Sequence, residues 1–167
     1  MRKIILIAVL LSSVSTSYSQ SNLGFSLGAG VSVFSEDAKK SSNAGVYVSF
    51  SISKVYFSVA SNFAKGKGEE LDFSSNETYN SNKVVLGVAN LGYIIELNKF
   101  NIIPVLGYGW SREIYEDPIA FDTYFYGDNE PHFNVGVKGS YLIGRNVAIA
   151  IGAGTFENLS GGVSYLF

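Results

Sequence analysis

Hydrophobic and polar residues alternate along most of the chain after its first twenty residues. A period of two is typical of a β-strand whose two faces meet different surroundings. In the stretch 23–34, for example, Leu27 and Val31 lie on one face with other large side chains, whereas Gly28 and Ser32 lie on the opposite face. The pattern predicts eight strands, over residues 23–34, 44–53, 55–63, 83–96, 100–110, 132–142, 146–154 and 159–167.

The face that lacks large side chains carries glycine, serine, alanine and an occasional tyrosine, but almost no charge. An eight-stranded barrel is just wide enough for side chains to fill its lumen, and small residues suit that crowded space. We therefore expect the small residues to point inward and the large apolar residues to face lipid. The fold class predicted is all-β, a closed antiparallel up-and-down transmembrane barrel.

Two of the predicted strands are less regular. The segment 83–96 is apolar on both faces, and we assign Leu91 and Tyr93 among others to its outward face. The segment 100–110 contains Pro104, which lacks the N–H that a sheet ladder needs, and a closed barrel has no free edge to accommodate it.

Lys138 is the one charge well inside a predicted strand, and the alternation turns it into the lumen. A buried ammonium needs a carboxylate or several hydrogen-bond acceptors. The predicted lumen faces contain no carboxylate in the middle of a strand. Glu96 is the nearest candidate within a strand, and the oxygens of serine and of Tyr47 and Tyr56 are the alternative partners.

The connections between the predicted strands alternate in length, which indicates the topology. Short turns are predicted at 53–54, 97–99 and 143–145, and long loops at 35–43, 64–82 and 111–131. Outer-membrane barrels have short periplasmic turns and longer outer loops. The connection 155–158 departs from this alternation, because it is a short loop on the side of the long ones.

The first nineteen residues have the form of a secretory signal peptide. Arg2 and Lys3 precede the apolar run 4–11, and small residues around Ser17 and Ser19 follow. The apolar run is shorter than the roughly 20 residues that span a bilayer as a helix. We expect cleavage near Ser19 and a barrel domain over 20–167.

Composition narrows the class of protein further. Charged residues make up 16% of the chain, against about 25% in typical soluble domains, which suggests a surface that is not all exposed to water. The formal net charge of -2 indicates no attraction to nucleic acid. The chain has no cysteine, so disulfides, thiol nucleophiles, cysteine-ligated metals and a lipoprotein anchor are excluded.

The C-terminal residues resemble the terminal signature of Gram-negative outer-membrane barrels. In that signature a final aromatic residue follows apolar or aromatic residues at every second position, and Val163, Tyr165 and Phe167 match it, with Gly161 a weak fit. The stretch 104–109 also resembles a strand of the small OmpA/OmpX-type barrel domains. The resemblance implies an outer-membrane location among lipid and lipopolysaccharide, and a last strand that the barrel-assembly machinery reads.

Candidate chemistry is sparse. His132 is the chain's one histidine, and it has no serine at a position that would match lipid A-modifying barrel enzymes. The Gly-x-Gly pairs continue into no nucleotide-binding motif, and Asp117 and the acidic run 128–130 fit no calcium-binding loop. We therefore predict no catalytic residue, no cofactor and no metal.

The predicted loop 111–131 is the most informative surface, because it combines acidic residues with tyrosine and phenylalanine. Exposed aromatic residues can mark an interaction site, and we predict an extracellular partner there. The aromatic residues are equally consistent with extensions of the flanking strands or with an interfacial belt.

Three hypotheses of function follow. The first is an outer-membrane barrel with a packed lumen, a structural or surface-interaction role and no catalysis. The second is a small lipid A-modifying enzyme that uses His132. The third is a soluble secreted or periplasmic barrel that binds an apolar ligand.

Overall fold

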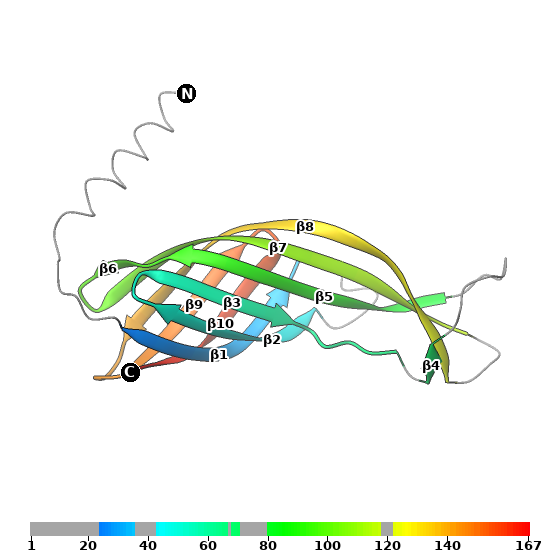
Figure 1. Ribbon diagram of the computed structural model, residues 1–167, viewed down its shortest axis with the longest axis horizontal. Coiled ribbons are helices and arrows are strands. Elements are labelled where there is room, and N and C mark those ends of the chain that lie inside the picture. Colours follow the sequence, from blue (N-terminus) through cyan, green and yellow to red (C-terminus); the bar gives the residue numbers. More distant parts are fainter. Residues whose placement is uncertain (1–23, 36–42, 67, 71–79, 118–121) are drawn as a thin grey trace, which may run out of the picture.

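The computed structural model describes residues 24–35, 43–66, 68–70, 80–117 and 122–167 (Figure 1). The predicted signal peptide, its cleavage near Ser19 and parts of the predicted loops therefore lie outside the described residues. The strands are β1 (Phe25–Phe34), β2 (Ala44–Ile52), β3 (Val55–Ser61), β4 (Glu69–Glu70), β5 (Asn80–Tyr93), β6 (Ile95–Leu97), β7 (Phe100–Glu116), β8 (Thr123–Leu142), β9 (Val147–Gly154) and β10 (Glu157–Leu166).

The strands form a closed barrel. Each wall strand pairs antiparallel with its neighbours in the sequence, and β1 also pairs with β10, so that Gly30 lies between Tyr47 of β2 and Gly162 of β10. Closure leaves no open edge within the wall. β6 continues β5, and the two-residue β4 pairs with the outer end of β8. The predicted closed eight-stranded all-β barrel is confirmed.

Pro104 lies in β7 opposite a gap between β5 and β6. The β5 ladder ends with Gly92 opposite Val105, and the β6 ladder resumes with Ile95 opposite Ile102, so the register is the same on both sides of the gap. Pro104 falls at this gap, and on its other side it keeps a partner in β8. A residue without an N–H costs least where the neighbouring strand is already interrupted, so this proline is compatible with a closed wall.

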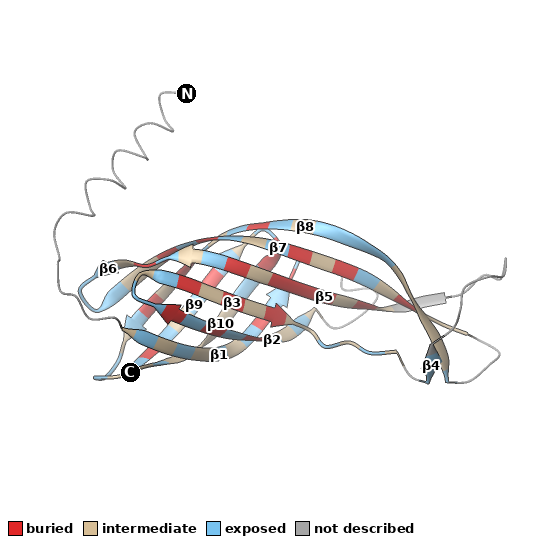
Figure 2. Cartoon of the chain, viewed as in Figure 1, coloured by how far each residue is buried: buried red, intermediate tan, exposed pale blue. Residues whose placement is uncertain are grey.

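The predicted inward and outward faces are confirmed by the burial of the side chains (Figure 2). In β2, Tyr47 and Ser49 are buried, whereas Val48 and Phe50 between and beside them are exposed. In β5, which is apolar on both faces, Leu91 and Tyr93 are exposed as predicted. Exposed large apolar residues occur on every wall strand, and they include Leu27, Val31, Val48, Phe50, Val55, Leu91, Leu106, Tyr108, Phe133, Val135, Ile149, Ile151, Val163 and Tyr165.

The two ends of the barrel differ. The predicted short turns at 53–54, 97–99 and 143–145 are confirmed, and they lie at the same end as Phe25 and the C-terminus (Figure 1). Ser53 and Asn98 have φ of 54° and 60°, the left-handed conformation that tight turns use. At the opposite end β5, β7 and β8 extend beyond the other strands. No described helix is long and apolar enough to cross a membrane.

The prediction of a loop over 111–131 is wrong. β7 continues to Glu116 and β8 begins at Thr123, so these residues form most of an antiparallel hairpin, with residues 118–121 outside the description. We call residues 111–116 and 123–131 the projecting hairpin. Its charged residues belong to strands, so Lys138 is not the one charge within a strand. The alternation ends at residue 110 because beyond the barrel rim neither face is uniformly apolar.

Candidate functional site

An ion pair lies in the middle of the barrel lumen. The ammonium of Lys138 in β8 lies 3.0 Å from each carboxylate oxygen of Glu157 in β10, and both side chains are almost fully buried. The ammonium also donates to Ser160 Oγ at 3.2 Å and lies 4.7 Å and 5.9 Å from the ring centroids of Tyr47 and Tyr56. Opposite charge, a hydroxyl and two ring faces together replace the water that a buried ammonium loses.

Two asparagines link the carboxylate of Glu157 in β10 across the lumen to β5 and β8. Asn90 Nδ2 donates to Glu157 Oε2 at 2.8 Å, and Asn134 Nδ2 donates to Asn90 Oδ1 at 2.7 Å. Ser32 Oγ donates to the other carboxylate oxygen at 2.6 Å. The backbone N–H groups of Phe156 and Glu157 donate to Asn134 Oδ1 at 2.9 and 3.0 Å. These buried polar groups therefore form a connected network.

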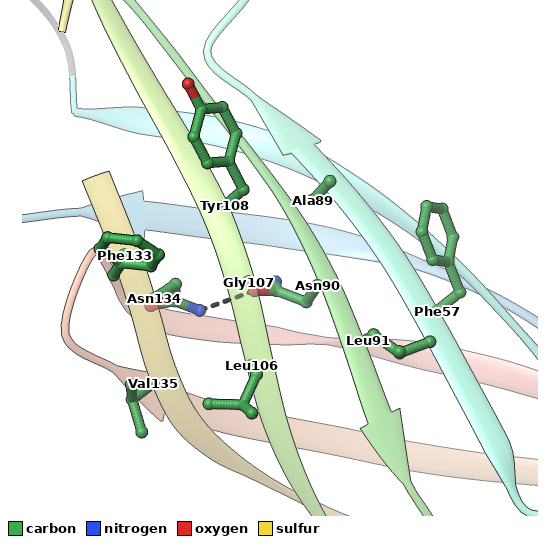
Figure 3. A pocket seen from close by; sticks show the side chains of 10 residues that line it. All are labelled: Phe57, Ala89, Asn90, Leu91, Leu106, Gly107, Tyr108, Phe133, Asn134 and Val135. Atoms are coloured by element: carbon green, nitrogen blue, oxygen red, sulfur yellow. Dashed lines mark hydrogen bonds between the residues drawn. The ribbon is translucent and has the colours of Figure 1, made fainter. Parts of the chain in front are cut away.

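The name lumen cluster is used below for this network, which comprises Ser32, Tyr47, Tyr56, Ser58, Asn90, Asn134, Lys138, Glu157 and Ser160. Glycines in the remaining strands make room for it. A Cβ on Gly107 would lie 2.1 Å from Asn90 Oδ1, and one on Gly152 would lie 2.6 Å from Lys138 Cγ. Figure 3 shows the bond from Asn134 to Asn90 beside Gly107.

Apolar side chains fill the lumen on both sides of the lumen cluster. The buried residues towards the short turns are Tyr56, Ile94, Ile103 and Val105. Those towards the projecting hairpin are Phe34, Tyr47, Ala60, Val84, Leu86, Val88 and Phe156. Along β5 and the residue that follows it, the inward residues pass from Val88 through Asn90 to Ile94, which gives the order of the layers. The interior is thus a packed core of three layers, as expected for eight strands.

The structure corrects the predicted partner of Lys138. The lumen does contain a carboxylate, that of Glu157, whereas Glu96 is exposed at the end of the barrel. Residues 155–158 are not simply a loop, since β10 begins at Glu157. Tyr47 and Tyr56 do lie beside Lys138, as predicted, but they offer ring faces to the ammonium.

A β-bulge explains why the alternation does not reveal Glu157. Val33 pairs with Leu159 but the next residue, Phe34, pairs with Glu157, so one residue of β10 is extra. Strict alternation from the outward Leu159 would place Glu157 outward as well. The bulge reverses the phase and turns Glu157 into the lumen. In the sequence, the one indication of this carboxylate is the inward position of Lys138, because a buried ammonium needs a carboxylate or several hydrogen-bond acceptors.

His132 has a serine partner that is distant in the sequence, Ser111 of β7. Ser111 Oγ lies 2.9 Å from His132 Nε2, and the imidazole stacks on Phe156 with ring centroids 4.4 Å apart. The serine is buried, and the pair lies on the inward face at the end of the barrel that adjoins the projecting hairpin. Among the described contacts no carboxylate bonds to this imidazole. The arrangement has two members of a triad, but its hydroxyl is buried and its histidine has no acidic partner among the described residues.

The aromatic residues of the projecting hairpin pack against one another. Tyr115 stacks on Phe125 across the strands, with centroids 4.8 Å apart, and its hydroxyl donates to Glu113. That hydrogen bond, with a smaller effect of partial burial, raises the pKa of Tyr115 to about 12. Lys83 of β5 pairs with Glu116 at 2.6 Å. The hairpin is therefore an ordered extension of the flanking strands, as one of the predicted explanations of its aromatic residues requires.

The three residues of the predicted assembly signal lie on the outward face of β10 or at its end. Val163, Tyr165 and Phe167 are all exposed. The ring of Phe167 lies 4.9 Å from Tyr165 and 5.5 Å from Phe25 of β1, centroid to centroid. The backbone N–H of Phe167 donates to the carbonyl of Phe25 at 2.8 Å. These residues thus lie at the seam where the barrel closes.

The outward face also carries a shallow apolar groove of about 440 Å³ over β3, β5, β7 and β8 (Figure 3). Its rim is formed by outward side chains such as Phe57, Leu91, Leu106 and Phe133. No reactive group projects into it from this face. In the described part of the chain, no three histidine, aspartate or glutamate side chains are grouped so as to hold a metal ion.

Comparison with known proteins relates the chain to barrels of the same fold. No protein-family model matches it, and no curated protein matches it. A solved structure of Neisserial surface protein A (NspA) is similar, with 12% identity, a TM-score of 0.52, and coverage of 87% of this chain and 98% of the other. The attachment invasion locus protein Ail of Yersinia pestis, solved with the heparin analogue sucrose octasulfate, has 11% identity, a TM-score of 0.45, and coverage of 86% and 94%. At these identities the likeness to NspA shows the fold, a small eight-stranded barrel.

Proposed function

We propose that this chain is an integral barrel protein of the bacterial outer membrane, with a packed lumen and a surface-interaction role for its projecting hairpin. One observation carries the proposal: large apolar side chains are exposed on the outward face of all the wall strands. Soluble monomers rarely expose contiguous apolar patches of more than a few hundred Å². An apolar band around a closed barrel is what a lipid bilayer requires.

The distribution of charge supports the same proposal. Within the wall the inward charges Lys138 and Glu157 neutralise each other. The other described charged residues lie towards the two ends of the barrel, with Lys99 and Arg145 in the short turns and Lys65, Lys83 and those of the projecting hairpin towards the opposite end. Hydrocarbon excludes unpaired charge, so both ends of the barrel would lie in water or among headgroups.

Membrane fractionation combined with gel mobility tests the location. The protein should stay in carbonate-washed outer membranes and should migrate faster without boiling than after boiling. Recovery of a folded protein in the soluble fraction would favour the alternative, a soluble barrel that binds an apolar ligand.

Single cysteines test the orientation, because the chain has none of its own. Asp128→Cys, in the projecting hairpin, should react with a membrane-impermeant maleimide on intact cells. Gly144→Cys, in a short turn at the other end, should react only after the outer membrane is permeabilised. The reverse labelling pattern would contradict a surface role for the hairpin.

The edge of β8 bears on how the hairpin would bind a partner. The carbonyl of Val135 accepts from the Thr155 N–H, and the Val135 N–H donates to Thr155 Oγ1, both at 3.0 Å. By alternation the backbone of Pro131 faces the same edge. Beyond Thr155 no described strand pairs with this edge until β4. Pro131 has no N–H to offer, and exposed Asp128 and Glu130 flank it. Such features discourage strand addition, so we assign the interaction to side chains of the hairpin.

We also propose that Val163, Tyr165 and Phe167 form the signal that the barrel-assembly machinery reads. Two observations support this proposal: the three side chains lie on the outward face, and they lie at the seam where β10 pairs with β1. Phe167→Asp should reduce the amount of heat-modifiable protein in the outer membrane while export continues. Arg145→Asp, at the same end of the barrel, is the control and should assemble normally. Equal assembly of both variants would contradict the signal.

The proposal includes no catalysis, since the hydroxyl of Ser111 is buried and His132 has no described carboxylate partner. Lipid A from cells that express the protein should have the same mass as lipid A from cells that express His132→Ala. A mass change that needs His132 would instead support the lipid A-modifying enzyme.

A further inference from the structure

A second groove, of about 330 Å³, lies where the apolar outward face meets the projecting hairpin. We call it the rim groove, and it is lined by Ser61, Phe63, Ala64, Lys65, Val85, Trp110, Arg112 and Tyr126. Val85 and Trp110 continue the outward faces of β5 and β7, so the groove opens on the side of the barrel that the proposed function assigns to lipid. Two of its residues are cationic and three are aromatic.

The two cations have no acidic partner in the described structure. Arg112 is exposed, its Nε donates to the carbonyl of Gly127 at 3.2 Å, and its guanidinium lies 5.1 Å from the ring centroid of Tyr126. These contacts hold the guanidinium in place but leave its charge unneutralised. No described carboxylate lies within salt-bridge distance of Arg112 or Lys65, in contrast to Lys83, which pairs with Glu116.

The indole of Trp110 in the rim groove packs over Gly87 of β5. A Cβ on Gly87 would lie 2.3 Å from the ring atoms Cε2 and Cζ2 of Trp110. The indole therefore lies over the glycine, against the outer wall. Below it on the same strand the outward residues are Tyr108 and Leu106, which belong to the apolar face. The groove thus joins a hydrocarbon-like surface to two positive charges.

The segment that follows β3 forms one wall of the rim groove, and its backbone has an unusual conformation. Phe63 has φ of 50°, which is uncommon for a bulky residue, and its side chain is 65% exposed. Asn62 holds this segment to β5, because its amide donates to the carbonyl of Val84 at 2.7 Å and accepts from Leu86 N–H at 2.9 Å. Strain maintained by surrounding bonds is frequent at ligand sites.

We propose that the rim groove binds a phosphorylated lipid of the outer leaflet, and this inference rests on the proposed function. The guanidinium of Arg112 and the ammonium of Lys65 bind the headgroup phosphate, for which Arg offers paired donors and Lys a point charge. Phe63, Val85 and Trp110 contact the start of an acyl chain. Aromatic residues at the membrane interface, with basic residues beside them, are suited to this combination.

Trp110 provides a direct probe, because it is the one tryptophan of the chain. The full-length protein, extracted from membranes in dodecylmaltoside, is titrated with diphosphoryl lipid A while the tryptophan emission is recorded. The emission should shift and saturate. Phosphatidylcholine at the same concentrations should give a much weaker response, because its headgroup carries no net charge.

The Lys65→Gln/Arg112→Gln double variant should bind lipid A at least about tenfold more weakly, since charged hydrogen bonds are worth that much or more. The matched control is Lys99→Gln/Arg145→Gln, which removes one lysine and one arginine from exposed turns at the other end. It should bind like the wild type. Heat-modifiable mobility of each variant verifies that it is folded.

Three outcomes would overturn the inference: equal affinity of the double variant, an equal response to phosphatidylcholine, or the same emission shift with inorganic phosphate alone, which would indicate a free-anion site. A failure of the proposed function is distinguishable. In that case the wild-type protein is absent from carbonate-washed membranes before any titration is made.

Discussion

β7 and β8 each pass through two regions of the molecule, and the comparison shows how surroundings select side chains. Within the wall, β8 alternates between exposed apolar residues such as Val135 and Val137 and the inward Asn134 and Lys138. In the projecting hairpin the same strand carries the run 128–131, all exposed. A strict period of two is expected where one face meets the lumen and the other meets the proposed membrane, and it is not expected where water lies on both faces.

The two regions also use ion pairs differently. The side chains of Lys138 and Glu157 are almost fully buried, whereas those of Lys83 and Glu116 are 31% and 29% exposed. A buried pair is held within a hydrogen-bonded network, and removal of one partner leaves the other charge uncompensated. A partly exposed pair is screened by water and contributes little to stability. The stability of the barrel should therefore depend on the lumen cluster far more than on the hairpin.

The largest effect is expected for Lys138→Met. Without a lumen carboxylate this change would be mild, but Glu157 alters the expectation. The variant leaves a buried carboxylate unpaired and should lose about 3–5 kcal/mol of unfolding free energy in a urea titration in lipid vesicles. Lys138→Met/Glu157→Gln removes both charges and should be clearly milder. A single variant as stable as the double variant would contradict the role of the pair.

The next effect tests the outward face of the wall. Ile149→Arg places a charge near the middle of the proposed membrane band, and it should cost about 2–4 kcal/mol in the same titration. Asn129→Arg is the control on the projecting hairpin, where the side chain is exposed, and it should stay within about 0.5 kcal/mol of the wild type. Equal tolerance of both changes would mean that the outward face is not in contact with lipid.

A smaller effect is expected from one methyl group in the lumen. In Gly107→Ala the new Cβ would lie 2.1 Å from Asn90 Oδ1 and 2.7 Å from the carbonyl oxygen of Ala89. Overpacking of this kind costs about 1–3 kcal/mol. Gly144→Ala is the matched control, because a Cβ there has no neighbour within 4 Å. Equal unfolding midpoints for the two variants would show that the lumen cluster accommodates the added methyl group without a loss of stability.

The smallest effect should follow from breaking the ion pair of the hairpin region. Lys83→Met removes the ion pair that Lys83 makes with Glu116, and exposed pairs contribute at most about 1 kcal/mol. Its loss should therefore be well below that of Lys138→Met when both are measured side by side. If Lys83→Met lost as much unfolding free energy as Lys138→Met, the hairpin would unfold cooperatively with the barrel, contrary to this expectation.

Alternation of residue type was sufficient for much of the wall. It determined the number of wall strands, the inward position of Lys138 and its neighbours Tyr47 and Tyr56, because a side-chain period of two leaves few choices when the two faces have different surroundings. It could not find the end of β7 or the start of β8. Beyond the rim the projecting hairpin is held by backbone pairing and by contacts such as Tyr115 with Phe125, which carry no such period.

Contacts between distant residues were decided by the tertiary structure. Glu157 reaches Lys138 because a bulge in β10 reverses the phase of the alternation, and bulges insert a residue without a strong sequence signal. Ser111 meets His132 because the register of β7 against β8 brings them together from 21 residues apart. The sequence by itself thus determined which side of the wall most residues occupy, since burial selects residue type position by position. Which side chains meet inside the barrel depended on register and bulges, which arise only when all eight strands close.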